Sequence, residues 1–291
     1  MTTTQAQLAK QANPTTAAWW AAEEPAHNAA EKGWYWFGRG LVDVLAGLRL
    51  KLDVQCHAPL PKGAKIIAAN HPTTTDPAIV LKLVDEQASI LISETLFKVP
   101  VLGRYLRRAG HVPVIRGSGQ AALDEGVRLL KAGRTVIIFP EGAISPLEGG
   151  CHKPHSGVAR LALASGAPVI PVGIGLDRAR VRLVETEVDG VTEVGTWYLG
   201  GPYAMTVGEP LIFGGDVEDR EAVRSAAEQI MGHIKQLARE SSARLEAPAG
   251  HRSGSLLGAR RPANGIGTGC PALAVKGRGD RAPTGPPSPL G

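Results

Sequence analysis

The chain has 291 residues, of which 43% are hydrophobic and 20% charged, a composition that supports a sizeable packed domain with extensions. The formal net charge of +5 at pH 7 favours an anionic partner, such as a membrane surface, a phosphate-bearing substrate or nucleic acid. No stretch of about 20 apolar residues could span a membrane, no secretory leader is visible, and three scattered cysteines indicate no disulfide framework, so we expect a cytoplasmic protein, soluble or peripheral on a membrane.

The N-terminal part, residues 1–60, is predicted to be a helical extension. Apolar side chains recur at helical spacing over residues 34–52, with charged side chains largely between them. Such a helix either packs its apolar stripe on the rest of the protein or lies at the headgroup boundary of a bilayer, and the sequence leaves both open. The stripe consists of Trp34, Phe37, Leu41, Val44, Leu45, Leu48 and Leu52.

Strands and helices alternate from Lys65 onward. This alternation predicts an α/β fold with a mainly parallel central sheet flanked by helices, in which active sites lie at the carboxyl ends of strands. The predicted strands are 65–69, 89–93, 112–115, 135–139 and 169–174, and the predicted helices between them are 78–86, 99–109, 120–132 and 157–165.

The remaining segments complete an α/β domain predicted for residues 61–246. Residues 177–202 are irregular and suggest an excursion or hairpin, 204–207 and 211–213 suggest late strands, and 219–245 an amphipathic helix. Residues 247–291 are rich in Pro, Gly and Arg without periodicity, which predicts a disordered tail.

A histidine and a carboxylate five positions apart follow the strand that begins at Lys65. Asp76 precedes Pro77 and an apolar helix, so it is also expected to be an N-cap. A carboxylate fixed there can accept from one imidazole nitrogen of His71 and leave the other to act as a general base. A structural histidine beside a helix cap is the alternative.

Two further strand ends carry candidate substrate-binding groups. The buried strand that starts at Thr135 ends in the turn at Glu141 and Gly142, where a carboxylate can bind hydroxyls and backbone N–H groups can approach an oxyanion. Arg116 follows a short apolar strand and can bind two phosphate oxygens. Taken alone, the Glu141 segment is also compatible with an ordinary turn, and the Arg116 segment favours a solvated arginine.

Together these motifs resemble one family, the glycerolipid acyltransferases that include 1-acylglycerol-3-phosphate acyltransferase. The order and spacing agree with the family from about residue 34 to residue 213. Its motifs are matched by Asn70, His71 and Asp76, by Arg116, by Phe139, Pro140, Glu141 and Gly142, and by the Pro-centred strand at 169–172.

The resemblance implies a His-Asp dyad, His71 and Asp76, that activates an acceptor hydroxyl for attack on the thioester of acyl-CoA or acyl-carrier protein. It also implies that Arg116, Glu141 and Gly142 bind the glycerol phosphate of a lysophospholipid, with no metal or other cofactor. The family usually continues its Phe-Pro-Glu-Gly motif with Thr-Arg-Ser, whereas this chain has Ala143, Ile144 and Ser145. Either Lys153 replaces the missing arginine or the acceptor is not a simple phosphomonoester.

Four other interpretations remain as alternatives or are disfavoured. The acceptor could be an aminolipid or glycolipid, or the chain could be a non-catalytic lipid-binding protein. Metal binding by residues 151–155 lacks a full ligand set. A nucleic-acid partner is disfavoured because basic and aromatic residues do not interleave along one stripe.

Overall fold

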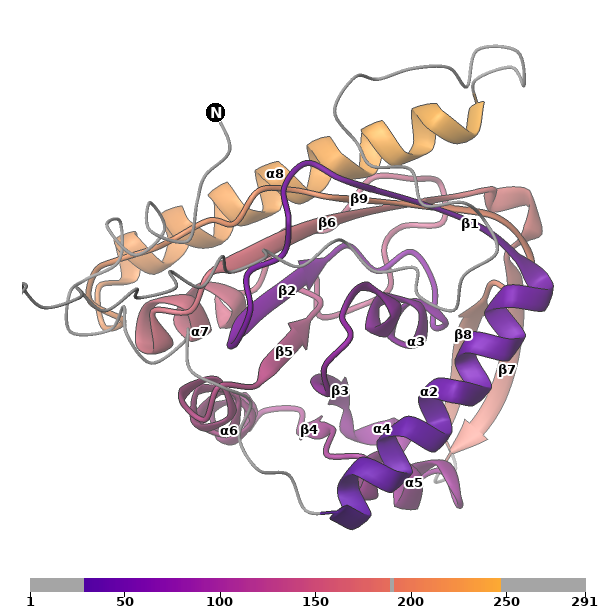
Figure 1. The fold of residues 1–291 in the computed structure, drawn as a ribbon, viewed down its shortest axis with the longest axis horizontal. Helices are drawn as coiled ribbons and strands as arrows, with labels where there is room; N and C mark the ends of the chain where they lie inside the picture. The colour runs from indigo at the N-terminus through magenta and orange to yellow at the C-terminus, as the bar shows by residue number, and fades with distance from the viewer. Residues whose placement is uncertain (1–28, 189–190, 247–291) are drawn as a thin grey trace, which may run out of the picture.

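The computed structural model describes residues 29–188 and 191–246, whose centre is a seven-stranded sheet (Figure 1). Neighbouring strands in this sheet run parallel except for the antiparallel pair β6–β9. The fold class predicted from the sequence is thus confirmed. In spatial order the strands are β1 (Leu50–Cys56), β9 (Gly201–Val207), β6 (Val169–Leu176), β2 (Lys65–Ala69), β5 (Thr135–Ile138), β3 (Ala88–Ser93) and β4 (Val112–Val114).

Helices cover both faces of the sheet, as the alternation of buried side chains along β2 requires. Ile66 and Ala68 belong to one apolar cluster, and Ile67 and Ala69 belong to another on the opposite face. The first cluster is completed by α6 (Gly119–Lys131), α7 (Gly157–Ser165) and α8 (Arg220–Glu246), and the second by α2 (Ala29–Arg49), α3 (Asp76–Val80), the 3₁₀ turn η1 (Leu81–Leu83), α4 (Glu94–Lys98) and α5 (Leu102–Arg108).

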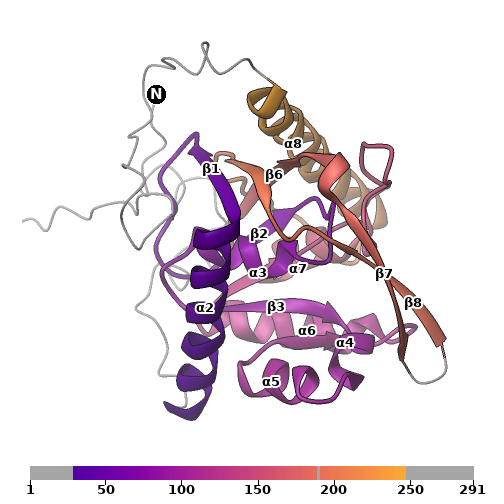
Figure 2. The same cartoon turned by 90° about the vertical axis from the view of Figure 1, so that its right-hand side faces the viewer.

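A two-stranded hairpin projects from the main sheet after the short 3₁₀ turn η2 (Arg178–Arg180) (Figure 2). It consists of β7 (Arg182–Val188) and β8 (Val191–Trp197), which pair antiparallel. The excursion predicted for residues 177–202 is therefore a hairpin. The late strand predicted at 211–213 is only an isolated bridge between Val169 and Leu211.

The N-terminal helix ends earlier than the sequence predicted. Leu50 and Leu52 were expected to be helical, but they begin β1, which pairs in parallel with β9. The prediction was wrong because Leu50, Leu52 and Val54 also alternate with period 2, and that face packs on the core. The predicted domain boundary at residue 60 thus falls between two strands of one sheet.

The apolar stripe of α2 does not pack on the sheet. Phe37, Leu41 and Leu48 are 68%, 55% and 77% exposed, and the helix instead buries Tyr35 and Arg39. Arg39 donates to the carbonyls at the end of η1, Leu81 O at 2.6 Å and Val84 O at 3.1 Å. Of the two alternatives drawn from the sequence, packing on the domain is wrong for this stripe.

None of the helices within the described residues is long and apolar enough to cross a membrane. The predicted tail at 247–291 and the first 28 residues of the predicted extension lie outside the described part of the chain.

Candidate active site

The loop that carries His71 begins at the carboxyl end of β2, in the middle of the sheet. Asn70 fixes its start, because its amide donates to Ile174 O at 3.0 Å and accepts from Ile174 N at 2.7 Å. These two bonds join β2 to β6 where their ladder ends. The residue before the histidine therefore sets the direction in which the loop leaves the sheet.

His71 and Asp76 form the pair that the sequence predicted. His71 Nδ1 lies 3.2 Å from Asp76 Oδ2, and the imidazole stacks on the Phe139 ring with centroids 4.3 Å apart. The Asp76 side chain is fully buried, whereas that of His71 is 17% exposed. His71 Nε2 has no hydrogen-bond partner among the described residues, so this nitrogen is available to an incoming hydroxyl.

The Asp76 carboxylate is held from several sides. It accepts from Thr73 N and Thr73 Oγ1, both at 2.6 Å, and from Tyr203 OH at 2.8 Å. The expected N-cap role is wrong, because the N-cap of α3 is Thr75 and the carboxylate turns back onto the loop. The buried carboxylate therefore serves the candidate site in one way, by orienting the imidazole of His71.

Tyr203 was missed by the sequence analysis. It lies in β9, 127 positions from Asp76, and is fully buried. Burial, followed by the nearby Asp76 carboxylate, raises the Tyr203 pKa well above its ordinary value, so the phenol remains a donor. A tyrosine in a late apolar strand carries no sequence signal for this contact, since only the β6–β9 pairing brings it to the loop.

The turn at Glu141 is bonded directly to the His71 loop. Glu141 Oε1 accepts from His71 N at 2.9 Å and from Ser145 Oγ at 2.6 Å, while Oε2 accepts from His152 N at 2.7 Å. Ser145 N in turn donates to His71 O at 2.8 Å. Glu141 is only 2% exposed, and both of its carboxylate oxygens accept hydrogen bonds from protein groups. These bonds join the His71 loop and the Glu141 turn into one unit.

Gly142 follows Glu141 with a φ of 64°, in the region that favours glycine. A Cβ at this position would lie 2.7 Å from the ring of His155, so the turn also requires a residue without a side chain. Gly142 is exposed, and it is followed by Ala143, the first residue at which this chain differs from the family motif.

Arg116 and Lys153 reach the same edge of the molecule from other loops, and both are exposed. Arg116 follows β4, which lies three strands from β2 in the sheet. At about 4.8 Å per strand, the two loops start on the order of 14 Å apart. Arg116 N donates to Glu94 Oε1 at 3.2 Å. Arg116 therefore lies at the same carboxyl-terminal edge of the sheet as His71 and Asp76, but it does not contact either residue.

The Cys151 thiol beside this loop is free, and burial followed by the Glu141 carboxylate raises its pKa to about 11. It is thus a thiol at neutral pH. Among the described residues no group of histidines, cysteines and carboxylates could hold a metal ion.

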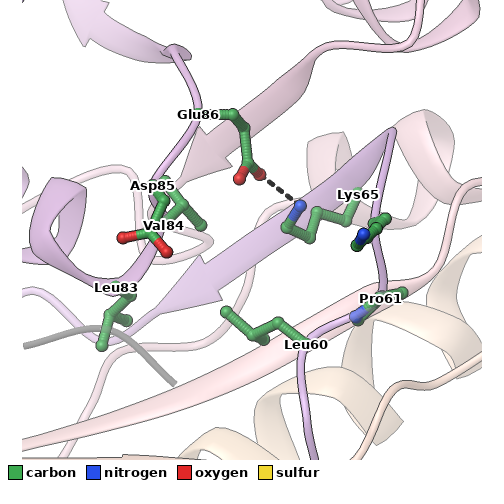
Figure 3. A pocket seen from close by; sticks show the side chains of 8 residues that line it. Leu60, Pro61, Lys65, Leu83, Val84, Asp85 and Glu86 are labelled. Carbon is green, nitrogen blue, oxygen red and sulfur yellow. Dashed lines mark hydrogen bonds and ion pairs between the residues drawn. The ribbon is translucent and has the colours of Figure 1, made fainter. Parts of the chain in front are cut away.

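A small pocket lies at the opposite, amino-terminal end of β2 (Figure 3). Lys65 forms an ion pair there with Glu86, which also accepts from Thr135 Oγ1 at 2.7 Å. Leu60 and Leu83 supply apolar walls. The pocket lies at the opposite end of the strand from the dyad, so it does not serve it.

The comparisons with known proteins agree with this geometry. The family model described as Acyltransferase matches residues 51–175. Residues 51–175 are therefore similar to the acyltransferase family, which confirms the resemblance drawn from the motifs.

Two curated proteins similar to this chain carry the same, more specific name. A 1-acyl-sn-glycerol-3-phosphate acyltransferase of Pseudomonas aeruginosa is 29% identical over 145 residues, which are 48% of this chain and 55% of that protein. One of Borreliella burgdorferi is 29% identical over 132 residues, covering 44% and 52%. The chain thus spans about half the length of the curated relatives it matches.

Among solved structures, the crystal structure of the 1-acyl-sn-glycerophosphate (LPA) acyltransferase PlsC from Thermotoga maritima is 24% identical, with a TM-score of 0.49. The match covers 75% of this chain and 80% of that chain.

Proposed function

We propose that this chain is an O-acyltransferase that moves a fatty acyl group from acyl-CoA or acyl-carrier protein to the hydroxyl of a lysophospholipid. The acceptor is a lipid such as 1-acylglycerol-3-phosphate, and the reaction belongs to phospholipid biosynthesis. The observation that carries the proposal is the His71–Asp76 pair, buried on the Asp76 side and open at His71 Nε2, within a segment similar to the acyltransferase family.

In the proposed reaction, His71 Nε2 takes the proton of the acceptor hydroxyl while its oxygen attacks the thioester carbonyl. Asp76 accepts from His71 Nδ1 and stabilises the imidazolium that forms. When the C–S bond breaks, the thiol leaves with the proton returned by His71, and the acyl oxygen ester remains. The reaction as proposed uses no cofactor beyond its acyl thioester.

Acceptor binding is assigned to the exposed groups at the same edge. Arg116 and Lys153 supply positive charge for a phosphate, and the backbone around Gly142 offers N–H groups. Glu141 belongs to this set as the residue that fixes the loop, since both its oxygens accept from protein groups. Acyl transfer to a lyso-aminolipid or lyso-glycolipid is the second candidate, favoured by Ala143 and Ile144 where the family has Thr-Arg.

The acceptor panel separates these candidates. Labelled acyl-CoA and acyl-carrier protein are supplied in turn with 1-acylglycerol-3-phosphate, other lysophospholipids, and lyso-lipids without phosphate. We expect transfer to a phosphorylated acceptor. A marked preference for non-phosphorylated acceptors favours the second candidate. Absence of thioester cleavage with every acceptor would favour a non-catalytic lipid-binding protein.

We also propose that α2 docks on the membrane that holds the acceptor, at its cytoplasmic face. Support comes from the exposed stripe on one side of the helix, which includes Phe37, Leu41 and Leu48. Vesicle co-sedimentation of wild type and a Trp34/Trp36/Phe37 triple alanine variant tests this. Loss of binding is expected in the variant, and equal binding by both proteins would exclude α2 as the anchor.

A further inference from the structure

The turn between α4 and α5 holds a strained, exposed valine. Val101 has a φ of 68° and a ψ of −57°, the one described non-glycine residue with positive φ. Leu102 N donates to Pro100 O at 2.8 Å across it, which makes a γ-turn of the rare, strained kind. The Val101 side chain is 68% exposed, so contacts of its own side chain do not offset the strain.

The close packing of α5 on α4 imposes this turn. A Cβ on Gly103 would lie 1.9 Å from Phe97 O, and Gly103 N donates to Val99 O at 2.8 Å. The chain must therefore reverse within Pro100 and Val101. The result is a fixed tip on which Val101 and the 37% exposed Leu102 point away from the core.

Positive charge surrounds this tip. Arg104, Arg107 and Arg108 are exposed, and they form no ion pair with any described residue. The sequence of α5, LGRYLRR, contains no acidic residue. The nearest acidic side chain of α4, Glu94, accepts from the backbone of Arg116. The Arg107 guanidinium lies 5.9 Å from the centre of the Phe97 ring, and the positive charge of α5 stays exposed without an ion pair to a described carboxylate.

The helix that follows the tip, α5, lies beside the exposed stripe of α2. The two helices touch where Gly38 leaves room for Tyr105, and the Arg108 guanidinium lies 5.2 Å from the centre of the Trp34 ring. Both views show α5 beside the N-terminal half of α2 and far from α8 (Figures 1 and 2). Apolar and basic side chains of the two helices therefore form one surface.

We propose that Val101, Leu102, Arg104, Arg107 and Arg108, here called the α5 surface, bind an anionic lipid bilayer as a second contact beside α2. The apolar tip inserts among the headgroups, and the arginines pair with lipid phosphates. The proposal rests on the proposed function only in that the acceptor is a membrane lipid. Its occupant follows from charge: an exposed apolar tip ringed by arginines matches a negatively charged, partly apolar interface.

Co-sedimentation with two kinds of vesicle tests the charge. One kind is phosphatidylcholine alone and the other an equal mixture with phosphatidylglycerol. An Arg104→Gln/Arg107→Gln/Arg108→Gln variant should bind the anionic vesicles roughly a hundredfold more weakly than wild type, and the neutral vesicles unchanged. A matched control, Lys62→Gln/Arg220→Gln/Arg239→Gln, loses the same charge from exposed positions on other elements and should lose only a fewfold. Equal losses in both variants would overturn the proposal.

A single substitution tests the tip. Glycine adopts the Val101 backbone without strain, so Val101→Gly should not lower the melting temperature. The variant should bind vesicles roughly tenfold more weakly, because it lacks the valine side chain that inserts into the bilayer. Unchanged binding would overturn the role of the tip. Acyl transfer by wild type to a water-soluble short-chain acceptor reports the proposed function separately, so that the two claims fail independently.

Discussion

Two loops at the same edge of the sheet differ in how firmly the protein holds them. The His71 loop is bonded to β6 through Asn70 and to the Glu141 turn through the His71 backbone, and its Asp76 also meets β9. The segment at Arg116 is exposed, and the hydrogen bond that ties it to another element runs from Arg116 N to Glu94. The difference teaches that the proposed base is preorganised, whereas the proposed phosphate contact is left open to its ligand.

Asp76→Asn should have the largest effect on the firmly held loop. Oδ1 and Oδ2 accept from Thr73 and Tyr203 as well as facing His71, and an amide must turn an NH₂ group toward one set of donors. We expect kcat to fall about a thousandfold with little change in KM. Steady-state kinetics with 1-acylglycerol-3-phosphate measure this, and a kcat within tenfold of wild type would contradict the dyad.

Strand β4, which precedes the Arg116 segment, begins directly after the titratable residue His111. His111 is buried and accepts from Ile90 N at 3.3 Å. Burial, followed by Arg134, lowers the His111 pKa from 6.5 to about 4. Between these values the unfolded chain binds a proton that the folded chain does not, so this contribution to stability is complete above pH 6.5 and is lost as pH falls toward 4.

The expected loss is about 3 kcal/mol in the free energy of unfolding. Denaturant unfolding of wild type at pH 7 and near pH 4 measures it, and His111→Gln supplies the comparison. The variant should lose less stability over this range than wild type by about that amount. The same pH dependence in both proteins would show that His111 does not hold β4.

Tyr203→Phe removes one support from the firm loop and keeps the shape. We expect kcat to fall about tenfold, with KM unchanged and the pH profile of kcat displaced, because Asp76 loses a donor. Tyr198→Phe is the matched control, since its hydroxyl donates to Pro202 O at 2.6 Å, away from the dyad. Equal kcat values in the two variants would assign Tyr203 a structural role only.

Arg116→Gln should have the smallest effect, on the open segment. An exposed ionic contact contributes about 1 kcal/mol or less, so KM for a phosphorylated acceptor should rise about fivefold. The KM for an acceptor without phosphate should not change. A similar rise with both acceptors would remove Arg116 from phosphate binding.

The sequence predicted the central part of this molecule well. β2 and α7 have the predicted bounds, because each is a short buried segment ended by clear turn residues. The His71–Asp76 pair was predicted from local spacing, and local spacing suffices for two side chains on one loop.

Contacts between distant segments were not predictable in the same way. Tyr203 reaches Asp76 only after β9 pairs with β6, and Glu141 reaches the His71 backbone only because β2 and β5 are neighbours. The early end of α2 was missed because Leu50 and Leu52 fit both a helical and an extended pattern. Which face of α2 is exposed depends on the surface beneath it, and one helix sequence cannot supply that.

The central claim is that His71 is the base of an acyl transfer. The direct test is formation of labelled phosphatidic acid from labelled acyl-CoA and 1-acylglycerol-3-phosphate by the full chain, compared with His71→Ala. The account predicts product with wild type, a loss of at least about a thousandfold with the variant, and an unchanged circular dichroism spectrum. Near-normal turnover by a folded His71→Ala chain would contradict it.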